Sequence, residues 1–95
     1  MAAYFIVDLD VTDPAGFREY QQLVGATIEQ YGGKYLVRGG AAETLEGDWL
    51  THRMVMLEFA SVEQAKRWYA SEEYAAIKDI RVRTAKTEMI LVQGV

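Results

Sequence analysis

The sequence predicts a single α+β domain over residues 1–95, with the ferredoxin-like order β-α-β-β-α-β and a four-stranded antiparallel sheet. Short apolar stretches of strand length alternate with segments of helical periodicity. Three of these stretches are apolar on both faces, although a chain of 95 residues has too few helices to cover both faces of its sheet. We therefore expect a second copy to cover the open face, which gives a dimeric α+β barrel.

The first strand is expected from Ala3 to Val11, followed by a helix. Asp13 is suited to cap that helix, and Pro14 to occupy its first position, where the missing N–H costs nothing. Apolar residues then recur at three- and four-residue spacing on one helical face: Phe17, Tyr20, Val24, Ile28 and Tyr31. Gly32 and Gly33 end the helix.

Two further strands are expected, from Lys34 to Arg38 and from about His52 to Phe59. Gly39 and Gly40 interrupt the first of them, and a loose extended segment with a turn at residues 46–48 joins the two.

Two serines mark helix starts in the second half of the chain. Ser61 opens a capping box, and Ser71 begins a third helix that is expected to run to about Ala85. The buried side of this third helix is predicted to carry Ala75, Ile77, Ile80 and Thr84. The last strand is expected from Thr87 to Gln93.

Strand alternation sorts the residues between the two faces of the sheet. The face under the helices is predicted to carry Phe5, Val7, Leu9, Val55, Leu57 and Phe59. The opposite face, which we call the outer face, is predicted to carry Tyr4, Ile6, Asp8, His52, Met54, Met56, Glu58, Ile90 and Val92.

Composition excludes several functions. The net charge of −4 disfavours a nucleic-acid partner, and the densest basic run is interpreted as the solvated face of a helix: Lys78, Arg81, Arg83 and Lys86. No apolar run has transmembrane length, so no membrane partner is expected. The absence of cysteine fits a cytoplasmic protein.

The motifs and their order resemble the domain-of-unknown-function family 1330 over nearly the whole chain. They are Thr12-Asp13-Pro14, Tyr20, Gly32-Gly33, Arg38-Gly39-Gly40, Leu45-Glu46-Gly47, Glu58-Phe59 and the run from Trp68 to Tyr74. That family is similar in fold to the dimeric α+β-barrel superfamily, which implies a homodimer. The superfamily includes cofactor-independent monooxygenases, muconolactone isomerases, haem enzymes and plain binding proteins, so the resemblance leaves function open.

Two motifs are candidate ligand-binding sites. Arg38 is suited to clamp a carboxylate or enolate, while Gly39 and Gly40 allow backbone N–H groups to approach a ligand; the alternative is a strand end with a salt bridge and a bulge. The second motif either lines an apolar pocket or packs in the core and caps a helix. Its residues are Trp68, Tyr69, Ser71 and Tyr74.

The catalytic candidates are His52, Glu58 and Tyr20. His52 is the only histidine and a possible general base, or a surface residue. Asp8 and Glu58 either have raised pKa values inside a closed barrel or pair with arginines near its rim. One histidine and no cysteine form no usual metal site, and haem would find only His52 as a ligand, so we expect no cofactor.

Two functions remain open from the sequence. The first is a homodimer that binds a small apolar or aromatic molecule between its helices and its sheet. The second is a cofactor-independent monooxygenase or isomerase that acts on an activated aromatic or lactone substrate. A cavity with a convergent arginine and a strongly shifted carboxylate would favour the enzyme.

Overall fold

A computed structural model describes the whole chain, residues 1–95. Its elements are β1 (Ala3–Val11), α1 (Pro14–Gln30), β2 (Lys34–Gly40), β3 (Arg53–Phe59), α2 (Val62–Tyr69), α3 (Glu72–Thr84) and β4 (Ala85–Gln93). The strands form one sheet in the order β2-β3-β1-β4, and all neighbours are antiparallel. The predicted ferredoxin-like α+β fold is confirmed.

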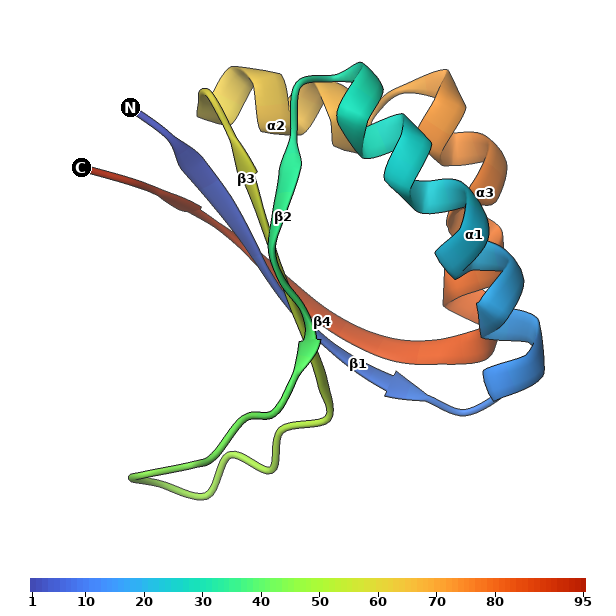
Figure 1. Ribbon diagram of the computed structural model, residues 1–95, viewed down its shortest axis with the longest axis vertical. Helices are drawn as coiled ribbons and strands as arrows, with labels where there is room; N and C mark the ends of the chain where they lie inside the picture. The colour runs from blue at the N-terminus through green and yellow to red at the C-terminus, as the bar shows by residue number, and fades with distance from the viewer.

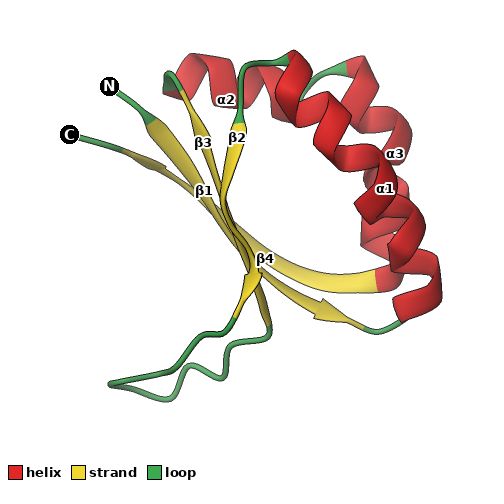
Figure 2. Ribbon diagram, viewed as in Figure 1, coloured by secondary structure: helices red, strands yellow, loops and turns green.

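All three helices lie on one side of the sheet, and no helix covers the outer face (Figure 1). Figure 2 shows the connection between β2 and β3, residues 41–52, as a loop that reaches away from the helices. The molecule therefore has one covered sheet face and one bare one.

The helix ends follow the local signals of the sequence. The Asp13 side chain accepts a hydrogen bond from the Gly16 N–H at 3.1 Å, and Pro14 opens α1. Gly32 takes the left-handed conformation after the helix, with φ +77°. Ser61 and Ser71 cap α2 and α3 as predicted, because each hydroxyl accepts an N–H three residues later.

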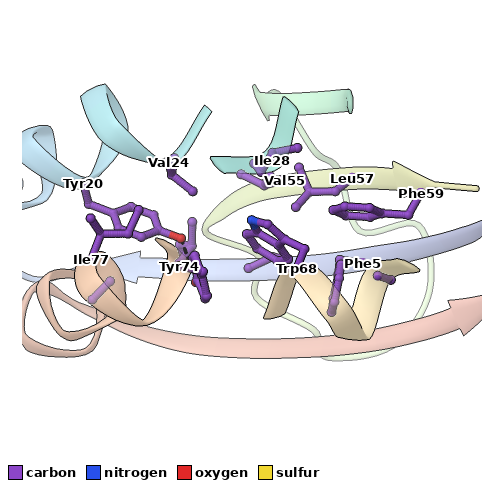
Figure 3. Close-up of a cluster of buried hydrophobic side chains, with 14 of the residues drawn as sticks. Phe5, Tyr20, Val24, Ile28, Val55, Leu57, Phe59, Trp68, Tyr74 and Ile77 are labelled. Atoms are coloured by element: carbon purple, nitrogen blue, oxygen red, sulfur yellow. Dashed lines mark hydrogen bonds between the residues drawn. The ribbon is translucent and has the colours of Figure 1, made fainter. Parts of the chain in front are cut away.

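The core lies between the sheet and the helices (Figure 3). Trp68 is its centre, with ring centroids 5.4 Å from Phe5, 5.6 Å from Phe59 and 4.3 Å from Tyr74. These rings come from β1, β3, α2 and α3, so their packing joins both helical segments of the second half to the sheet.

The buried side of α3 differs from the prediction. Ile77 and Thr84 are buried as expected, but Ala75 is exposed and Ile80 only half-buried. Tyr74 and Arg81 take their places. The prediction was wrong because it placed only Ala, Ile and Thr on the buried side and left out the arginine. Positions 74, 77, 81 and 84 follow one another at spacings of three and four residues, so they share one side of the helix. Arg81 therefore does not belong to a solvated helix face.

The outer face is apolar and uncovered within the chain. Register places Ile6 opposite both Met56 and Ile90, and Tyr4 opposite Val92, all on this face. Ile90 is 58% exposed and Val92 39%. The loop 41–52 adds three further exposed apolar side chains: Leu45, Trp49 and Leu50.

Candidate functional site

A narrow cleft opens between the helices and the sheet. The free space within it is about 40 Å³, or about 500 Å³ when the open mouth is counted, and eleven of its fifteen lining residues are hydrophobic. Val7, Val24 and Trp68 are among them, so β1, α1 and α2 all contribute walls. The four remaining lining residues are Gln21, Arg38, Arg53 and Arg81.

The charged side chains of this cleft are all arginines. Arg38 is exposed, Arg53 is half-buried, and Arg81 is buried with 7% exposure. None of the three forms an ion pair, since the salt bridges of the molecule involve other residues. No aspartate or glutamate lines the cleft. The cleft is therefore apolar and locally positive in a chain whose net charge is −4.

Two tyrosine hydroxyls join Arg81 in a buried chain of hydrogen bonds. Arg81 Nε donates to the Tyr74 hydroxyl at 3.1 Å, and the Tyr74 and Tyr20 hydroxyl oxygens are 2.8 Å apart. Figure 3 shows Tyr20 and Tyr74 side by side, reaching out from facing helices. Burial, reinforced by Tyr74, raises the pKa of Tyr20 well above its ordinary value. The Tyr20 hydroxyl is therefore a hydrogen-bond donor at neutral pH rather than a base.

The Arg38-Gly39-Gly40 segment forms an irregular strand end beside Arg53. The pairing register of β2 shifts between Arg38 and Gly40, as the bulge interpretation predicted. The predicted salt bridge is absent, and the Arg38 guanidinium instead stacks over the Tyr35 ring, with 4.7 Å from Cζ to the centroid. Gly39 has φ +71°, and a Cβ there would lie 2.6 Å from Cζ of Arg53. The glycine thus leaves room for that guanidinium.

The aromatic motif divides between core, cap and surface. Trp68 is buried, lines the cleft and donates from Nε1 to Thr27 Oγ1 at 3.0 Å. Ser71 caps α3, and Tyr74 is fully buried behind Tyr20. Tyr69 is 37% exposed outside the cleft, where the Lys78 ammonium lies 4.4 Å from its ring centroid.

His52 and Glu58 lie on the outer face, away from the cleft. Glu58 pairs with Lys34 at 3.1 Å. His52 donates its backbone N–H to Asp8 at 3.0 Å, and its Nδ1 lies 3.2 Å from the same carboxylate oxygen. The structure therefore separates these two catalytic candidates from Tyr20, Arg38 and Trp68 by the thickness of the sheet.

Asp8 anchors the loop 41–52 to the sheet. Besides the His52 contacts, its second oxygen accepts from Trp49 Nε1 at 3.0 Å. Burial raises the pKa of Asp8, but the hydrogen bonds from Trp49 and His52 and the charge of His52 outweigh it, so that the pKa lies below its ordinary value. A raised pKa inside a closed barrel was one of two alternatives for this carboxylate; in the single chain the partners of Asp8 are Trp49 and His52, from a loop about 40 residues away in the chain, and not an arginine.

No group of three or more His, Asp or Glu side chains is arranged to hold a metal ion. None of the helices is both long and apolar enough to cross a bilayer.

Sequence reasoning missed two arginines of the cleft. Arg53 shares strand parity with Val55, Leu57 and Phe59, which places it on the helix-covered face. That signal was available in the sequence. Arg81 could be found only from its helical spacing to the buried Tyr74. A search that admits only apolar residues to the buried side of a helix does not find it.

Comparisons with known proteins support the fold. A family model described as "Domain of unknown function (DUF1330)" matches residues 2–95. No curated protein matches the sequence.

Several solved structures are similar in fold. A protein of unknown function from Rhodopseudomonas palustris has a TM-score of 0.78 at 17% identity, covering 99% of this chain and 82% of that one. SnoaB, a cofactor-independent oxygenase from Streptomyces nogalater, has a TM-score of 0.68 at 13% identity, with 99% and 93% covered. A conserved protein from Methanosarcina mazei has a TM-score of 0.61 at 19% identity, with 100% and 95% covered. At these identities the likeness concerns the fold alone.

Proposed function

The chain belongs to the DUF1330 family, and on that premise we propose that it binds a small apolar or aromatic molecule in the cleft between its helices and its sheet. The observation that carries this proposal is the cleft itself, with eleven hydrophobic lining residues and a few convergent polar groups. Tyr35 is half-buried and can offer ring surface to a flat ligand, while Trp68 and Tyr20 are buried residues of the cleft wall. No cofactor is part of the proposal, and the absence of cysteine supports a cytoplasmic location.

The proposal includes a homodimer closed through the outer face. Ile90 is 58% and Val92 39% exposed there, beside the half-buried Met54 and Met56. A domain of this size buries only a small core of its own, so it would gain stability if a second copy covered this patch.

Catalysis by a cofactor-independent monooxygenase or isomerase is the second candidate. In its favour, the fold is similar to that of SnoaB, and the Tyr20 hydroxyl and the cleft arginines are suited to stabilise an enolate. Against it, no carboxylate or imidazole lines the cleft to take a proton from a substrate. The shifted carboxylate, Asp8, lies on the other face of the sheet with its pKa lowered. Simple binding is therefore the better-supported function.

Filling the cleft tests the binding function. Isothermal titration calorimetry with 2-naphthoate and 2-naphthamide should show saturable binding of at least one of these flat bicyclic probes. Val24→Phe places a ring in the cleft and should abolish that binding. Leu23→Phe is the matched control, because Leu23 is its neighbour in α1, is 43% exposed and does not line the cleft.

Circular dichroism verifies that both variants keep the fold. Binding that survives Val24→Phe unchanged, or no binding of either probe to the wild-type protein, would refute the proposed site.

A charge on the outer face tests the dimer. Sedimentation velocity should give a dimer for the wild-type protein and a monomer for Met56→Glu, because the substitution places an unpaired carboxylate in the interface. Val82→Glu is the control, since Val82 is 57% exposed on α3, on the helical side. A monomeric wild-type protein, or a Met56→Glu dimer, would contradict the outer-face interface.

A further inference from the structure

We infer that the molecule bound in the cleft is an aromatic or apolar carboxylate, whose acid group is held by Arg81 and Arg53 with a hydrogen bond from Tyr20. This inference rests on the proposed binding function and names the chemical class of its ligand. It depends on charges in the cleft that no side chain of the protein neutralises.

Arg81 is the strongest of these observations. The residue is 7% exposed, and its side chain makes one hydrogen bond, from Nε to the Tyr74 hydroxyl. No carboxylate lies within 4.0 Å, and the two terminal nitrogens have no acceptor in the protein and keep contact with solvent. An arginine stays charged at every physiological pH, and its terminal N–H groups match the two oxygens of a carboxylate. An anion in the cleft would supply the missing counter-ion.

Arg83 shows what an arginine of the same helix does when no ligand is involved. It lies two residues further along α3, is 62% exposed and pairs with Asp79 at 2.7 Å, one turn earlier. Arg81 faces Tyr20 and Tyr74 instead of a carboxylate. The difference indicates that the surroundings of Arg81 are built for a charge that the chain itself does not provide.

The order of donors and acceptors along Arg81, Tyr74 and Tyr20 determines which proton is available to a ligand. Arg81 can only donate, so the Tyr74 oxygen accepts from it. When the Tyr74 hydroxyl in turn donates to Tyr20, the proton of Tyr20 has no acceptor within the protein and is free for a ligand in the cleft. Burial keeps that proton in place by raising the pKa of Tyr20. Arg81 and Tyr20 both line the cleft, so both can offer donors to a ligand bound there.

Arg53 adds a second cation on the sheet side of the cleft. Its guanidinium occupies the space that the missing side chain of Gly39 leaves open. A carboxylate matches the planar fork of a guanidinium with two parallel hydrogen bonds. The other lining residues are mainly apolar, so they suit a hydrocarbon or aromatic body rather than a polyanion.

A pair of probes that differ only in charge tests the inference. 2-Naphthoate and 2-naphthamide have nearly the same shape, and only the first carries a carboxylate. Calorimetry on the wild-type protein should give a dissociation constant about tenfold or more lower for the naphthoate. Arg81→Met should remove most of this preference and leave the affinity for naphthamide within about threefold. Arg83→Met, the control on the same helix, should keep the preference.

The outcomes separate the two proposals. Equal affinities in the wild-type protein, or a naphthoate preference that survives both Arg81→Met and Arg53→Met, would overturn the anionic ligand and leave binding in the cleft intact. No binding of either probe would overturn the binding function itself. Arg53→Met gives an independent reading if Arg81→Met does not fold, because Arg53 is only half-buried, and a preserved preference in that variant alone would then count against the inference.

Discussion

On the outer face of the sheet the polar side chains of Asp8, Glu58, His52 and Lys34 meet partners, whereas on the helix-covered face Arg38, Arg53 and Arg81 meet no opposite charge. The outer face is exposed and apolar around its paired charges, and the covered face is packed around its unpaired ones. The outer face thus leaves an apolar surface uncovered, and the helix-covered face leaves arginine charges without a counter-ion. In the two proposals, the unpaired charges point to a ligand and the exposed apolar area points to a partner.

The largest effect is expected where the covered face is most tightly packed. Trp68→Ala should lower the free energy of unfolding by about 3–5 kcal/mol, because the residue is buried against Phe5, Phe59 and Tyr74. Ile90→Ala on the outer face should cost less than about 1 kcal/mol in the monomer, since Ile90 is 58% exposed. Urea denaturation measures both.

Urea denaturation at several protein concentrations tests whether Ile90 lies in an interface between copies. A cost of Ile90→Ala that grows with protein concentration would place Ile90 in an interface between copies, whereas a cost of Trp68→Ala near that of Ile90→Ala would contradict the assigned core.

The two hydrogen-bonded tyrosines, Tyr20 and Tyr74, should differ in their contribution to stability. Tyr74→Phe removes the only recorded acceptor of the buried Arg81 and should cost about 1–3 kcal/mol. Tyr20→Phe removes one neutral hydrogen bond and should cost about 1 kcal/mol. Equal losses in thermal or urea unfolding would mean that Arg81 finds another acceptor.

The attachment of the loop 41–52 should depend on pH. Asp8→Asn should cost about 1–2 kcal/mol at neutral pH, because Asp8 accepts hydrogen bonds from Trp49 and His52. The pKa of Asp8 is lowered in the folded state, so its contribution is complete well above the ordinary value of 3.8 and is lost as the pH falls below it through the folded pKa.

Urea unfolding of the wild type and Asp8→Asn at several pH values measures this dependence. The two stabilities should converge toward pH 3 and below. A difference that is constant from pH 7 to pH 3 would mean that the carboxylate charge plays no part in holding the loop.

The smallest effect belongs to the paired charges of the outer face. Glu58→Gln should change the unfolding free energy by less than about 1 kcal/mol, since its partner Lys34 is 68% exposed and solvent screens the pair. High salt should shrink the difference further. A larger cost that persists in salt would show that Glu58 has a partner beyond Lys34.

The elements of this fold were predictable because their signals are local. Asp13 and Pro14 start α1, Gly32 ends it, and Ser61 and Ser71 cap the two later helices, as the structure confirms. Strand alternation assigned the residues of β1 and β3 to the correct faces. The candidate site was predicted only in part: Arg38, Tyr20 and Trp68 come together at the cleft, while His52 and Glu58 lie on the other face.

The sequence by itself determined which segments form helices and strands and which sheet face carries apolar residues, because capping and hydrophobic periodicity act between residues a few positions apart. The tertiary structure decided which charges find partners. Trp49 reaches Asp8 across 41 positions, and Tyr20 reaches Tyr74 across 54. Such contacts depend on how distant segments pack, so the lowered pKa of Asp8 and the unpaired Arg81 become visible only in the folded molecule.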